Sequence, residues 1–122
     1  MNTISVDLTS DSYQIHVGHH LLAQAGNLIR SCTSGSKILV VTHPDLNKLF
    51  GAELLASLES AGFSVTTAEV PTGEHAKSFE SYQKLVSVLA ENRFTREDII
   101  VAFGGGVIGD LAGFAAATYM RG

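Results

Sequence analysis

A run of glycines near the C-terminal end of the chain has the spacing of a phosphate-binding turn. The segment GGGVIGD places glycines at 104, 106 and 109, directly after the apolar run 98–103. A turn without Cβ atoms lets a phosphate approach the backbone, and the free N–H groups of a following helix stabilise its negative charge. The pattern alone is a weak signal, because a tight glycine turn that packs a helix closely against a sheet has the same spacing.

Four charged or polar side chains could contact a nucleotide bound at such a turn. Glu74 and Lys77 stand three residues apart where a loop leads into a helix, so they would share one face if the helix begins early. An ordinary surface ion pair has the same spacing. His43 follows another apolar run. Asp110 is expected in the first turn of the last helix, where the helix dipole favours an acid whether or not it binds a ligand.

The elements that must position these residues alternate between strand and helix. Alternating residues in 3–8 and 13–18 predict a β-hairpin, continuous apolar runs predict buried strands, and helical periodicity fills the intervals. After the hairpin we expect a helix over 20–30, strand 37–42, helix 45–60, strand 63–70, helix 79–93, strand 98–103 and a helix that starts within the glycine run. This order predicts an α/β fold: an open, Rossmann-like, mostly parallel sheet flanked by helices, with an N-terminal β-hairpin.

Ligands bind such sheets at the carboxyl ends of the strands, and three loops are expected there. They are THPD, PTGEHAK and GGGVIGD. A simple dinucleotide dehydrogenase fits poorly, because its glycine turn follows the first strand and an acid lies ~20 residues later to hold the ribose. The sequence therefore predicts a nucleotide site of a less common arrangement.

Composition narrows the remaining classes. The 122 residues are enough for one domain, and 12 acidic against 8 scattered basic residues do not favour nucleic acid as a partner. We expect no membrane association, because no apolar run approaches the ~20 residues that span a bilayer. A single cysteine, Cys32, and an N-terminus without secretory character favour the cytoplasm. No metal-ligand spacing is present, so we expect no metal site within these residues.

Two stretches together carry a specific resemblance. PTGEHAKS (71–78) and GGGVIGDLAGFAAATYMRG (104–122) resemble the sugar phosphate cyclase family, and within it the 3-dehydroquinate synthases. The resemblance extends more loosely through the hairpin and the strand KILVVT. It covers essentially the whole chain but only about the first third of the family's length. It implies that residues 1–122 are an N-terminal NAD-binding domain, without the helical C-terminal domain that carries the metal and most of the substrate site.

The resemblance also implies roles for particular residues. His43 stands where the family often has Asp or Asn, so its contact with the adenosine ribose is left open, with Asp45 as an alternative. Arg121 matches an arginine that reaches the substrate phosphate across a dimer. No catalytic residue and no metal ligand is implied within the chain. The residues implied to contact NAD or its pyrophosphate are Gly73, Glu74, Lys77, Gly105, Gly106, Val107 and Asp110.

The activity implied by the resemblance belongs to aromatic amino-acid biosynthesis. The family converts the sugar phosphate 3-deoxy-D-arabino-heptulosonate 7-phosphate to 3-dehydroquinate and phosphate, with a tightly held NAD acting as a catalyst and a divalent zinc or cobalt ion. The resemblance implies a homodimer, and an isolated chain that is catalytically inactive. The alternatives are another sugar phosphate cyclase, a metal-dependent glycerol dehydrogenase relative, or a stand-alone, non-catalytic nucleotide-binding module.

Overall fold

Strand β3 (Lys37–Thr42) is the centre of a three-stranded parallel sheet. It pairs with β4 (Ser64–Glu69) on one side and with β5 (Ile99–Ala102) on the other, so the strand order is β4-β3-β5. The register places Val40 opposite both Thr67 and Val101. This computed structural model describes residues 2–9 and 12–121.

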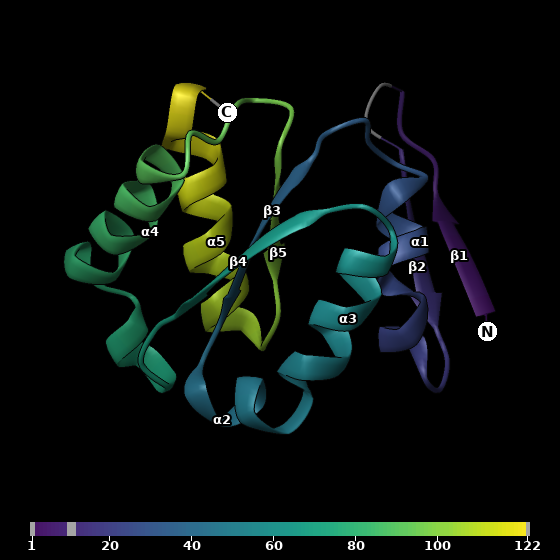
Figure 1. Ribbon diagram of the computed structural model, residues 1–122, viewed down its shortest axis with the longest axis horizontal. Helices are drawn as coiled ribbons and strands as arrows, with labels where there is room; N and C mark the ends of the chain where they lie inside the picture. The colour runs from purple at the N-terminus through teal and green to yellow at the C-terminus, as the bar shows by residue number, and fades with distance from the viewer. Residues whose placement is uncertain (1, 10–11, 122) are drawn as a thin grey trace.

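Helices cover both faces of the sheet and make a three-layer structure (Figure 1). Helices α1 (Ala25–Arg30) and α3 (Ala52–Ser60) lie on one face, and α4 (Phe79–Glu91) and α5 (Gly106–Thr118) lie on the other. Shorter turns complete the connections: a 3₁₀ turn at Leu21–Gln24, the short helix α2 (Pro44–Leu46), a π turn at Asn47–Gly51, and 3₁₀ turns at Gly73–Ala76 and Tyr119–Arg121.

The side chains of β3 alternate between two apolar clusters. Leu39 and Val41 pack with residues of α4 and α5, and Ile38 and Val40 pack with Leu54, Leu58 and Phe63 on the α3 side. A strand covered on both faces needs a continuous apolar sequence, and this is why KILVVT reads as one uninterrupted run. Helices therefore cover both faces of this strand, as predicted.

The N-terminal hairpin is present as predicted, but it packs loosely. Strands β1 (Asn2–Val6) and β2 (Tyr13–Val17) are antiparallel, with Ile4 opposite Ile15. Nearly every described side chain in these strands is exposed, with only Val6 and His16 half-buried. Residues 10 and 11 of the expected turn lie outside the described residues. The hairpin thus stands beside α1 without a core of its own (Figure 1).

The α/β fold class is confirmed, while two predicted helices differ from the structure. The segment expected as one helix over 20–30 begins as a 3₁₀ turn, because His20 has a left-handed backbone with φ of 59° and starts the turn. The helix expected over 45–60 contains a π turn. In that turn the Asn47 Nδ2 donates to Glu69 Oε2 at 2.8 Å, which ties the widened turn to the end of β4.

Asp98 joins the amino ends of β3 and β5. Its carboxylate accepts from the amides of Ser36 (3.3 Å) and Lys37 (3.0 Å) and from the amide of Thr95 (2.8 Å). Burial alone would raise the pKa of Asp98, but the hydrogen bonds from Thr95, Lys37 and Ser36 outweigh it and lower this pKa below its ordinary value. The ionised form is therefore the one that the fold stabilises.

We expect Asp98→Ala to lower the free energy of unfolding by about 2 kcal/mol at pH 7, because hydrogen bonds to a charged group are lost. Since the folded-state pKa is lowered, this contribution is complete above the unfolded pKa of about 3.9 and disappears as the pH falls through the folded value. Urea unfolding of both proteins at pH 7 and pH 3 measures this loss of free energy and its decrease at low pH. Glu97→Ala removes the exposed carboxylate of the preceding residue and is the control. It should change the free energy of unfolding little.

Candidate cofactor site

Three loops meet at the carboxyl edge of the sheet and enclose a small cavity. One follows β3, one follows β4, and the glycine turn follows β5, as the sequence predicts for a ligand-binding edge. The cavity has a volume of about 180 Å³ and is lined by His43, Pro71, Thr72, Gly73, Gly105, Gly106, Val107 and Ile108. Residues more than sixty positions apart in the chain are therefore brought to one point.

The glycine turn is packed at one position and open at the next two. A Cβ on Gly104 would lie 2.8 Å from Cγ1 of Ile108, so this glycine allows close packing of the helix. A Cβ on Gly105 or Gly106 would meet nothing within 4 Å. The close-packing explanation is thus confirmed for Gly104, while phosphate binding stays a prediction for Gly105 and Gly106. The open pair is the part that could admit a phosphate.

The start of α5 leaves backbone donors beside that open space. Gly105 is the N-cap residue with an extended backbone, and no side chain caps the helix there. The first amides of a helix have no partner within it, so those of Gly106, Val107 and Ile108 are available at the cavity. Unpaired N–H groups at a helix N-terminus favour an anion. The turn therefore fits the pyrophosphate of a dinucleotide.

Asp110 and Lys77 form an ion pair beside the turn. Their Oδ2 and Nζ atoms are 2.9 Å apart, with 67% and 43% of the side chains exposed. The predicted position of Asp110 in the first helical turn is wrong: α5 begins at Gly106, so Asp110 lies in the second turn, facing Lys77. The helix dipole therefore does not account for the acid at this position, and the ion pair with Lys77 gives it a contact within the fold.

Glu74 and Lys77 do not share a helix face, because the early helix start that this would need does not occur. Glu74 lies in the 3₁₀ turn at Gly73–Ala76, and α4 begins only at Phe79. The helix cannot start earlier because Ser78 caps it in an extended conformation, with its Oγ accepting from the amide of Ser81 at 3.1 Å. The loop therefore turns Lys77 toward α5.

The charges around Lys77 favour its ionised form. The hydrogen bond to Asp110, then the charge of Asp110 and that of Glu74, raise the pKa of Lys77 above its ordinary value. A raised pKa means that the contribution of this amine is complete below the unfolded pKa of about 10.4 and is lost only as the pH rises through the folded value. Lys77 is therefore a permanent cation next to the glycine turn at physiological pH.

His43 has a structural role that the sequence analysis did not identify. It is the N-cap of α2, and its Nδ1 accepts from the amide of Leu46 at 3.4 Å. An accepting Nδ1 carries no proton, so the neutral ring holds its proton on Nε2. Pro44 at the first helical position was the available signal for this cap. His43 also lines the cavity, so the cap fixes the position of this side chain at the cavity wall.

Two further features of this edge come only from the structure. Gly73 has a φ of 79°, a conformation that favours glycine and sets the bend of the loop after β4. Thr42, the last residue of β3, is completely buried, and its Oγ1 has no hydrogen-bond partner in the described part of the protein. A buried hydroxyl without a partner costs about 1–3 kcal/mol. The strand sequence KILVVT alone does not predict how the Thr42 hydroxyl is buried.

A hollow of about 490 Å³ is lined in part by Lys77 and Asp110 of the ion pair. Its apolar walls include Phe79, Tyr82 and Phe114, with the rings of Tyr82 and Phe114 centred 4.9 Å apart. Phe79 and Phe114 are largely exposed. Lys77 and Asp110 line the same hollow, so the ion pair borders an aromatic surface.

The remaining predicted roles are limited by what the structure describes. The side chain of Arg121 lies outside the described residues, and its contact with a substrate phosphate stays a prediction. Within residues 2–9 and 12–121, no three His, Cys, Asp or Glu side chains are grouped so that they could hold a metal ion. In the same ranges, no helix has the length and apolar character to span a membrane.

Comparison with known proteins gives the same fold and a close group of relatives. The chain superimposes on 2-deoxy-scyllo-inosose synthase with a TM-score of 0.85 at 20% identity, over 99% of this chain and 34% of that one. It superimposes on a 2-epi-5-epi-valiolone synthase from Streptomyces hygroscopicus subsp. jinggangensis, solved with NAD⁺ and Zn²⁺ bound, with a TM-score of 0.76 at 27% identity, over 95% and 32% of the two chains. The fold is that of the N-terminal part of sugar phosphate cyclases.

Sequence comparison is more specific. The family described as "3-dehydroquinate synthase N-terminal" matches residues 67–122. The 3-dehydroquinate synthase of Nostoc sp. is 44% identical over 121 residues, which is 99% of this chain and 33% of the relative. That of Desulforamulus reducens is 41% identical over 122 residues, which is 100% and 34%. The chain is thus similar along its whole length to 3-dehydroquinate synthases, and it spans about a third of the length of the curated relatives it matches.

Proposed function

We propose that this chain is the NAD-binding domain of a 3-dehydroquinate synthase, and that the complete protein converts 3-deoxy-D-arabino-heptulosonate 7-phosphate to 3-dehydroquinate and phosphate. The observation that supports this best is the open glycine turn at the start of α5, with the Lys77–Asp110 pair and His43 around it. Relatives at 41–44% identity carry the synthase name, whereas the other cyclases align at 20–27%. The alternative activities have less support.

In this proposal the chain's residues bind and orient the cofactor. The amides of Gly106 and Val107 bind the pyrophosphate, and the cation of Lys77 adds positive charge next to it. Glu74 and Asp110 accept from hydroxyl or amide groups of the dinucleotide, and the Nε2–H of His43 donates to the adenosine side. The cofactor, once bound, supplies a reversible hydride acceptor.

The rest of the reaction machinery is assigned to residues outside this chain. The proposal places the zinc or cobalt ligands, the catalytic groups and most substrate contacts in the remaining two-thirds of the length found in relatives. Structures of related cyclases contain NAD⁺ together with Co²⁺ or Zn²⁺, which supports a need for both groups in the complete protein. A homodimer, a contact of Arg121 with the substrate phosphate, and a cytoplasmic location complete the proposal. The isolated chain is then inactive but still binds the cofactor.

Calorimetric titration of the chain with NAD⁺ tests the cofactor site. We expect saturable 1:1 binding that weakens about 100-fold in the Glu74→Ala, Asp110→Ala double variant, because hydrogen bonds to charged groups contribute about 1.5–3 kcal/mol each. The matched control is Glu53→Ala, Glu91→Ala, which removes two acids on α3 and α4 far from the cavity. Equal affinity of all three proteins would show that the cofactor does not bind at this edge.

A further inference from the structure

The switch point of the sheet lies between β3 and β5. The chain leaves β3 on one side for β4 and then crosses back to β5 on the other side, which gives the strand order β4-β3-β5. In open α/β sheets, ligands bind outside the carboxyl ends of the strands at such a point. The cavity of about 180 Å³ between His43 and the glycine turn lies there. A dinucleotide with its pyrophosphate at the glycine turn therefore has the end of β3 as its neighbour.

The end of β3 presents one residue to this cavity. The amide of Phe103 donates to the carbonyl oxygen of Val41 at 2.9 Å, so the pairing of β5 with β3 extends to the residue before the glycine turn. Thr42 follows Val41 and is completely buried. His43 comes next, is half-buried and lines the cavity. His43 is therefore the first residue after β3 that a bound dinucleotide would meet.

Dinucleotide sites of the usual kind have an acid at this place. In the common dinucleotide fold, an Asp or Glu at the end of the strand next to the glycine-turn strand accepts hydrogen bonds from the adenosine ribose. Its negative charge also disfavours a nucleotide that carries a phosphate on the 2′ position, because like charges then lie close together. One carboxylate thus both binds NAD⁺ and excludes NADP⁺.

The cavity beside His43 offers no carboxylate among the described residues that line it. Glu69, at the end of β4, accepts from Asn47 Nδ2 at 2.8 Å. Asp110 and Glu74 both act on the charge of Lys77. Asp45 is exposed, two residues beyond His43, and does not line the cavity. The position at which an acid would distinguish the two dinucleotides is therefore occupied by an imidazole.

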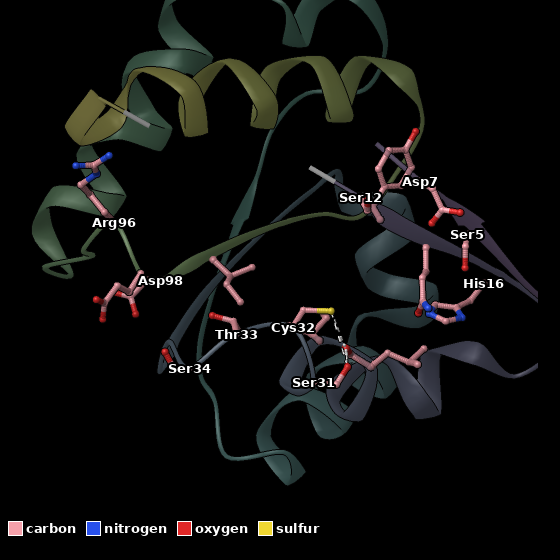
Figure 2. A pocket seen from close by; sticks show the side chains of 16 residues that line it. Ser5, Asp7, Ser12, His16, Ser31, Cys32, Thr33, Ser34, Arg96 and Asp98 are labelled. Atoms are coloured by element: carbon pink, nitrogen blue, oxygen red, sulfur yellow. Dashed lines mark hydrogen bonds between the residues drawn. The ribbon is translucent and has the colours of Figure 1, made fainter. Parts of the chain in front are cut away.

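A second and larger cavity has acids in its walls, but it lies at the amino end of the sheet. It has a volume of about 1190 Å³, and Figure 2 shows Asp7 on its hairpin side and Asp98 on its sheet side. Asp98 accepts from the amides of Ser36 and Lys37 at the start of β3. These carboxylates are at the opposite end of the strands from the glycine turn and cannot contact a ribose bound there.

We propose that His43 removes the discrimination between NAD⁺ and NADP⁺, so that the site accepts dinucleotides with or without a 2′-phosphate. The ring accepts from the Leu46 amide at Nδ1, at 3.4 Å, which leaves Nε2–H as its donor. An N–H group donates equally to a ribose hydroxyl or to a phosphate oxygen, and a neutral ring does not repel the phosphate. The inference rests on the proposed function for the position of the dinucleotide, and it adds the range of dinucleotides that bind.

The variant His43→Asp tests this role without removing the helix cap. Asp and Asn are both preferred N-cap residues, so either can replace His43 at the start of α2. His43→Asn is the matched control, because its side chain has nearly the shape of Asp but no charge. Calorimetric titrations at pH 8 with NAD⁺ and with NADP⁺ give both dissociation constants. The protein is the complete gene product that contains this chain, freed of bound nucleotide, and circular dichroism shows that each variant is folded.

We expect the unaltered protein and His43→Asn to bind the two dinucleotides within ~10-fold of each other, and His43→Asp to prefer NAD⁺ by at least ~100-fold. A larger preference for NAD⁺ in the unaltered protein would overturn the proposal, and its loss in Asp45→Asn or Glu74→Gln would assign the ribose to that acid instead. An unchanged ratio in His43→Asp would also overturn it. If neither dinucleotide bound, the proposed cofactor site itself would be wrong, which distinguishes that failure from a failure of selectivity.

Discussion

Gly105→Val is expected to abolish NAD⁺ binding while the domain stays folded. Gly105 has φ of −83° and ψ of −163°, an extended backbone that valine adopts readily, and a Cβ there meets no protein atom within 4 Å. The branched side chain would instead fill the open space at the start of α5. We expect affinity for NAD⁺ to fall at least ~100-fold, or about 2.7 kcal/mol. Calorimetry gives the affinity, and circular dichroism gives the melting temperature.

Gly113→Val is the matched control for this substitution. Gly113 lies on the same helix, and a Cβ there is equally unhindered, but it does not line the cavity. Both variants should melt within a few degrees of the unaltered chain. If Gly105→Val bound NAD⁺ as tightly as Gly113→Val, the glycine turn could not be where the pyrophosphate binds.

Gly26→Ala is expected to have the opposite profile, with a large loss of stability and no direct effect on the site. Helix α1 crosses α3 so closely that a Cβ on Gly26 would overlap the carbonyl oxygen of Ser57. The Gly26 amide also donates to Ser57 Oγ at 2.9 Å. A clash with backbone cannot be relieved by a rotamer change, so the helices must separate.

We expect this overpacking to cost about 3 kcal/mol and to lower the melting temperature by about 10 °C. Thermal unfolding compared with Gly113→Ala, the same substitution in open space, isolates the effect of the contact. A melting temperature within 2 °C of the control would mean that α1 and α3 are not packed as described. Well below its melting temperature, Gly26→Ala should keep the NAD⁺ affinity of the unaltered chain.

The alternation of strands and helices could be predicted because each element carries its own local signal. KILVVT and DIIVAF are continuous apolar runs, and FESYQKLVSVLAENR has a regular apolar stripe. The helix that starts within the glycine run was equally visible. What local patterns could not give was the widened turn at 47–51, since the hydrogen bond from Asn47 to Glu69 joins residues from different elements.

The candidate site was predicted in its parts but not in its contacts. The spacing of Glu74 and Lys77 suggested a pair within one turn, but Ser78 caps α4 and sends Lys77 to Asp110 instead. Such a contact depends on how α4 and α5 pack, which no residue spacing encodes. The buried hydroxyl of Thr42, which has no partner among the described residues, could not be predicted for the same reason, since its burial is set by the layers around β3.

Phosphate release by the native protein is the decisive test of the proposed activity. An antibody against residues 1–122 captures the gene product from its source cells, and the captured protein is incubated with 3-deoxy-D-arabino-heptulosonate 7-phosphate with and without added NAD⁺. We expect a captured protein about three times the length of this chain that releases phosphate and forms 3-dehydroquinate. A captured protein that binds NAD⁺ but leaves this substrate unchanged would contradict it.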